Sequence, residues 1–180
     1  VSAISSRTRL SASRRSVRQA RSAGWAASLY LPNELVARLE ACDPRRTLDE
    51  GNVDDFLALI EEVDHLVTFA DRACHGDAEV SLLELEWHAA VSKALVAAHF
   101  VARLTGRARL AEGERAFVDY HVFHKTSYPR DELGERYREA ERLAWRFVSD
   151  LRTRKPAERV RRLRRFHRAS YHEKLRRYAA

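Results

Sequence analysis

Two pairs of potential metal ligands have the spacing that places both members on one side of a helix. Glu84 and His88 are four residues apart, and His121 and His124 are three residues apart, so each pair is expected to share a helix face. If the two faces meet, three imidazoles and a carboxylate can surround a zinc or iron ion and leave one position open. The alternative, which we favour, is that these side chains hydrogen-bond to one another or lie at exposed helix edges.

The usual sequence motifs of enzymes are absent. The chain has no His-Glu-x-x-His, no Gly-rich phosphate loop and no Gly-x-Ser-x-Gly elbow. Di-iron carboxylate proteins require two Glu-x-x-His pairs, and only residues 62–65 have that spacing. His65 lies almost opposite the apolar stripe of its segment, so we expect it to face solvent. A metal-dependent helical-bundle enzyme is therefore the second of two hypotheses about function.

The first hypothesis rests on the arginine-rich C-terminal segment. We expect one helix that begins at Pro156 and runs nearly to the C-terminus. Guanidinium groups make paired hydrogen bonds to phosphates, and interleaved aromatic rings, among them Phe166 and Tyr178, can stack on unpaired bases. The candidate nucleic-acid-binding residues are Arg161, Arg162, Arg164, Arg165, Arg168 and Tyr171. RNA is the favoured ligand, and an acidic protein surface is the alternative.

The distribution of charge supports a polyanionic partner. Residues 1–24 carry six arginines and no acid, residues 25–151 carry 15 basic and 24 acidic residues, and residues 152–180 carry 12 basic and two acidic residues. The sequence therefore predicts a basic N-terminal arm, an acidic helical body and a basic C-terminal helix. The basic ends are expected to contact nucleic acid, or the acidic body of the same or another subunit. The oligomeric state stays open.

The elements that must position these side chains are helices. Residues 81–104 are apolar on most sides, so this segment is expected to form a central buried helix. Ser81 and Glu84 are expected to form a capping box at its start, and Gly106 is expected to terminate it. Other helices are predicted at about 34–41, 53–73, 112–125 and 131–151, with no strands. The predicted fold is an all-α bundle of five to six mostly antiparallel helices around the central one.

Cysteine content and hydropathy indicate the compartment. Cys42 and Cys74 are far apart and belong to no disulfide framework, which favours reduced thiols in a cytoplasmic protein. No apolar run is long enough to cross a bilayer. The alternative is an organelle, if the Arg- and Ser-rich residues 1–24 are a transit peptide. Binding ranks above catalysis because the charge asymmetry is counted directly, whereas the metal site depends on an unknown helix pairing.

Overall fold

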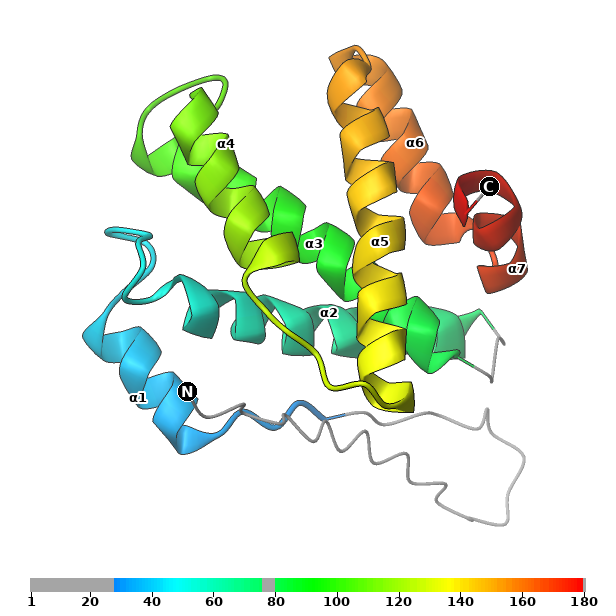
Figure 1. Cartoon of the computed structure of the whole chain (residues 1–180), viewed down its shortest axis with the longest axis horizontal. Helices are drawn as coiled ribbons and strands as arrows, with labels where there is room; N and C mark the ends of the chain where they lie inside the picture. Colours follow the sequence, from blue (N-terminus) through cyan, green and yellow to red (C-terminus); the bar gives the residue numbers. More distant parts are fainter. Residues whose placement is uncertain (1–27, 76–79, 180) are drawn as a thin grey trace.

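The computed structural model describes residues 28–75 and 80–179, and these residues form an all-α bundle, as predicted (Figure 1). No strand occurs in this part of the chain. The α-helices are α1 (Asn33–Ala41), α2 (Val53–Cys74), α3 (Leu82–Leu104), α4 (Glu112–Asp119), α5 (Glu132–Thr153), α6 (Pro156–Arg168) and α7 (Tyr171–Lys174). Two π-helical turns, η1 (Tyr120–His124) and η2 (Leu175–Ala179), extend α4 and α7.

Helix α3 is the central buried helix that the sequence predicts. It packs against α2 and against α5, which runs across both in Figure 1. Trp87 on α3 is fully buried, and so are most of the small residues along the helix, including Ala90 and Ala94. Small side chains let the neighbouring helices approach closely, while Trp87 fills the space between α3 and the C-terminal segment.

The C-terminal end of α3 was predicted correctly, and the cap at its N-terminal end was not. Gly106 adopts a positive φ of 65°, and the amides of Gly106 and Arg107 donate to carbonyls of the last turn. This arrangement is a Schellman motif, which confirms the predicted stop. The predicted capping box is wrong, because Ser81 makes no side-chain cap hydrogen bond. Glu84 instead accepts hydrogen bonds from two buried cations, Arg72 and Lys174.

Helix α5 forms the second wall of the core. Leu143, Ala144 and Phe147 on its inner face are almost completely buried. Asp131 caps its start by accepting from the Gly134 amide at 2.7 Å. A β-carbon at Gly134 would lie 1.9 Å from the carbonyl oxygen of Pro129, so only glycine fits where the preceding loop crosses the first turn.

Two predicted helices differ from the observed ones in their C-terminal parts. The fourth helix changes from α to π geometry at Tyr120. The predicted single C-terminal helix is broken at Ala169 and Ser170, which separate α6 from α7. The bundle therefore contains seven α-helices in its described part instead of five or six.

Some predictions concern residues outside the described ranges. The basic arm at residues 1–24 is one of them. Over residues 28–75 and 80–179, no helix combines the length and apolar character that a membrane span requires.

Candidate nucleic-acid interface

Helix α6 is anchored in the core by one fully buried aromatic side chain, while Leu163 packs half-buried against the core. Phe166 is its only buried residue. The Phe166 ring stacks on Phe147 with 4.5 Å between centroids and contacts the edge of Trp87 at 5.4 Å. Proline at the first helical position starts the helix, since its missing N–H would have no partner there. With one residue turned inward, most of the arginines of α6 lie on its exposed side.

The break after α6 is produced by a long-range hydrogen bond. Ala169 has extended backbone angles, and its carbonyl oxygen accepts from the Arg72 guanidinium at 2.7 Å. Ser170 then caps α7 by accepting from the Glu173 amide at 3.4 Å. The predicted continuous helix is wrong because an arginine 97 residues earlier takes the carbonyl that the next turn would use.

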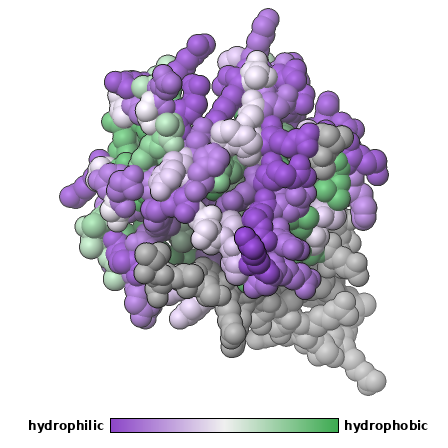
Figure 2. Space-filling view, in the orientation of Figure 1, coloured by the Kyte–Doolittle hydropathy of each residue, from purple (hydrophilic) through white to green (hydrophobic). Residues whose placement is uncertain are grey.

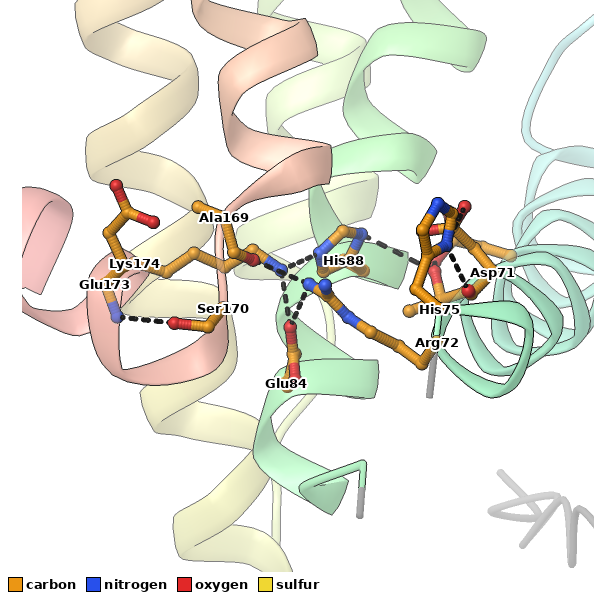
Figure 3. A network of polar contacts seen from close by, with 11 residues as sticks. Asp71, Arg72, His75, Glu84, His88, Ala169, Ser170, Glu173 and Lys174 are labelled. Atoms are coloured by element: carbon orange, nitrogen blue, oxygen red, sulfur yellow. Dashed lines mark hydrogen bonds and ion pairs between the residues drawn. The ribbon is translucent and has the colours of Figure 1, made fainter. Parts of the chain in front are cut away.

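Lys174 fastens α7 to α3 from the inside (Figure 3). Its side chain has no exposed surface. The ammonium donates to Glu84 Oε1 at 2.5 Å and to His88 Nε2, and it lies 5.0 Å from the centroid of the Phe166 ring. Glu84 also accepts from Arg72 Nη2 at 2.7 Å. One carboxylate thus joins the end of α2, the start of α3 and the C-terminal segment.

The charge balance of this network sets its protonation states. Burial lowers the pKa of Lys174 to about 8, although the Glu84 carboxylate opposes the shift. Burial, with Lys174 beside it, also holds the pKa of His88 well below its usual value. A neutral His88 can accept a hydrogen bond from the Lys174 ammonium at Nε2. The ring hydrogen is then on Nδ1, which lies 3.5 Å from the Thr68 hydroxyl.

The arginines of α6 fall into two groups. Arg162 pairs with Asp150 at 2.8 Å, and Arg159 donates to the backbone carbonyls of Arg152 and Arg154. These two hold α6 to the end of α5. The side chains of the second group make no ion pair or hydrogen bond with any residue in the described ranges, and the group consists of Arg161, Arg164, Arg165 and Arg168.

The four arginines of the second group line one hollow. The hollow has a volume of about 400 Å³ and is completed by Ala169 and Glu173 where the chain turns into α7. The Glu173 carboxylate pairs with Arg177 at 2.7 Å, which offsets the single negative charge at the rim. We call these six residues the arginine hollow. Figure 2 shows that the face of the molecule seen in the orientation of Figure 1 is mostly hydrophilic, including the part where α5 and α6 lie.

The aromatic side chains predicted to stack on bases have different positions. Phe166 belongs to the core, and Tyr178 packs against the rings of Trp87 and Phe147. Tyr171 is half-buried at the start of α7, where its ring contacts that of His172 at 5.8 Å. Tyr171 therefore stays partly accessible at the start of α7, between Ala169 and Glu173 in the sequence, while the other two rings are used for folding.

The structure separates the two pairs of predicted metal ligands. Glu84 and His88 face the C-terminal end of α2, where Arg72 and Thr68 lie. His121 contacts Asp54 at 3.1 Å, near the N-terminal end of the same helix. His124 is exposed, 5.5 Å from the ring of Trp145. The expectation that the two faces meet is wrong, because η1 and the start of α3 contact opposite ends of α2.

Sequence reasoning missed two contributors to the buried network. Neither Arg72 nor Lys174 was assigned to a candidate site, yet both are buried. His65 was expected to face solvent, and it is buried as well. A signal for Lys174 does exist, since it interrupts the narrow apolar edge that Val160, Leu163, Phe166 and Tyr171 form in the sequence pattern.

Comparison of the chain with protein-family models, with curated proteins and with solved structures finds no match.

Proposed function

We propose that the protein binds single-stranded RNA through the arginine hollow. The observation that supports the proposal is that Arg161, Arg164, Arg165 and Arg168 converge on one hollow without an acidic partner in the described part of the chain. Four neighbouring guanidinium groups repel one another and gain most from an anion that bridges them. Phosphate is the anion whose geometry matches paired guanidinium hydrogen bonds.

Single-stranded RNA is favoured over an acidic protein surface because rings are interleaved with the arginines in the sequence. Tyr171 is half-buried and His172 is exposed, while the ring of the exposed His167 also contacts those of His88 and Phe166. Rings in these positions can stack on unpaired bases while the guanidinium groups hold the phosphates. The carboxylates of an acidic protein surface would pair with the guanidinium groups, but they have no ring that could stack on these aromatic side chains.

The backbone course supports a fixed binding geometry. The arginines belong to α6, and Ala169 and Glu173 belong to the turn and α7. Because Arg72 holds the Ala169 carbonyl and Lys174 holds α7 on Glu84, the two sides of the hollow have a defined relative position. Less conformational entropy is then lost on binding.

The test is fluorescence anisotropy of a labelled, unstructured single-stranded RNA at increasing salt. A variant in which all four hollow arginines are glutamine loses up to four phosphate contacts. At roughly 0.7 per contact, its plot of log affinity against log salt becomes shallower by about 3. Deleting residues 152–180 would be a poor test, because it would also remove Phe166 from the core.

A matched control changes the same number of charges elsewhere. Arg103, Arg107, Arg109 and Arg115 are exposed near the connection from α3 to α4, which lies away from α6 and α7 in Figure 1. Replacing these four by glutamine is expected to leave most of the affinity and of the salt slope intact. Equal losses in both variants, salt-independent binding, or tighter binding of polyglutamate than of RNA would refute the proposal.

A further inference from the structure

A second polar cluster lies between α2 and α3, separate from the network around Lys174. Glu61 and His65 are one turn apart on α2, and Glu86 faces them from α3. One ligand atom from each of the three side chains lies within 4.8 Å of the others, and this is the one group of at least three such ligands among the described residues. We propose that Glu61, His65 and Glu86 form a binding site for a divalent transition-metal ion.

The orientation of His65 is the first support. The residue is 5 % exposed, and its Nε2 atom has no hydrogen-bond partner among the described residues. Nε2 lies 3.6 Å from Glu86 Oε2. Two ligands of one tetrahedral zinc ion lie about 3.4 Å apart, given bonds of about 2.0–2.2 Å. The His65 and Glu86 atoms thus already have almost the required separation.

The second support is an excess of negative charge. Three carboxylates, those of Glu61, Glu141 and Glu86, act on the single ammonium of Lys93, which is half-buried. This cluster is short of positive charge, and a divalent ion supplies it.

Lys93 does not fill the site. Its ammonium donates to Glu61 Oε2 at 2.6 Å, and a carboxylate has a second oxygen that can accept an ion at the same time. The Glu61 and Glu86 side chains are 20 % and 10 % exposed, so an ion can enter from the surface. One imidazole, two carboxylates and an open fourth position suit zinc or another imidazole-binding divalent ion.

The experiment titrates Zn²⁺ into the full chain by calorimetry. Cys42 and Cys74 are exposed thiols and bind zinc themselves, so every protein carries Cys42→Ser and Cys74→Ser. We expect one ion per chain, bound more weakly as the pH falls, because the His65 imidazole must be deprotonated to bind. Circular dichroism of each variant checks that the helices are retained.

The variants decide between the metal site and a simple ion pair. Loss of a ligand in His65→Gln or Glu86→Gln is expected to weaken zinc binding on the order of 10–100-fold or more. His99→Gln, at an exposed position on α3, is the control and is expected to bind as the parent does. Absence of stoichiometric zinc, or equal affinity in all three variants, overturns the assignment.

Discussion

The buried ammonium of Lys174 makes the stability of the fold depend on pH in alkaline solution. The side chain is completely buried, and its pKa is about 8 in the folded protein against 10.5 for an ordinary lysine. The unfolded chain therefore binds this proton more tightly than the folded chain does. Stability must rise with pH wherever the unfolded state holds more protons.

The sign and window follow from the two pKa values. Below about pH 8 the ammonium is charged in both states, and its burial is a constant cost. Between about pH 8 and pH 10.5 the folded protein loses the proton while the unfolded chain keeps it, so this cost disappears. The difference corresponds to about 3 kcal/mol in the free energy of unfolding, at about 1.36 kcal/mol for each tenfold change.

The assay compares the protein with Lys174→Met by urea denaturation from about pH 7 to about pH 11. Titration of every other group contributes to both proteins and cancels in the difference. We expect the free energy of unfolding of the parent, relative to the variant, to rise by about 3 kcal/mol across this range. Lys155→Met, at an exposed position before α6, is the control. If the difference in the free energy of unfolding between the parent and Lys174→Met does not change with pH, Lys174 is not a buried ammonium.

Four further substitutions test the packing and the helix cap described above. Gly134→Ala is expected to lower the free energy of unfolding by about 1–3 kcal/mol through its clash with the preceding loop, whereas Gly113→Ala, with open space around it, is expected to raise it by about 0.4–1 kcal/mol. Phe166→Ala removes a fully buried ring and is expected to cost about 3–5 kcal/mol and to weaken RNA binding, because α6 loses its only fully buried side chain. Asp131→Ala removes the cap of α5 at a cost of about 1 kcal/mol. Thermal and urea denaturation measure all four effects; unchanged stability in Phe166→Ala, or a stabilising Gly134→Ala, would contradict the packing.

Features that depend on nearby residues could be predicted from the sequence. The apolar character of α3 on most sides placed it in the centre, and Gly106 marked its end, because both signals lie within a few residues of the feature. The i, i+4 spacing also predicted correctly that Glu84 and His88 share a face. It could not show which neighbour that face meets, since Lys174 is 90 residues from Glu84.

The errors share a physical cause. His65 was assigned to solvent because it lies off the apolar stripe of α2, but the packing of α3 on α2 buries it, with Glu86 Oε2 3.6 Å from its Nε2. The break at Ala169 is invisible to helix propensity, because Arg72 competes for the carbonyl only when the chain is folded. In each case a tertiary contact between polar groups outweighed the local pattern.

The three-way contact at Glu84 has a consequence for how the sequence can diverge. Arg72 and Lys174 share one carboxylate, and they lie 12 and 90 positions away from it along the chain. Replacing Glu84 alone would leave two buried cations without their shared carboxylate. We therefore expect an inherited change at position 84 to be accompanied by changes at positions 72 and 174. Homologues whose sequences have otherwise diverged would still be recognisable by correlated residues at these three positions.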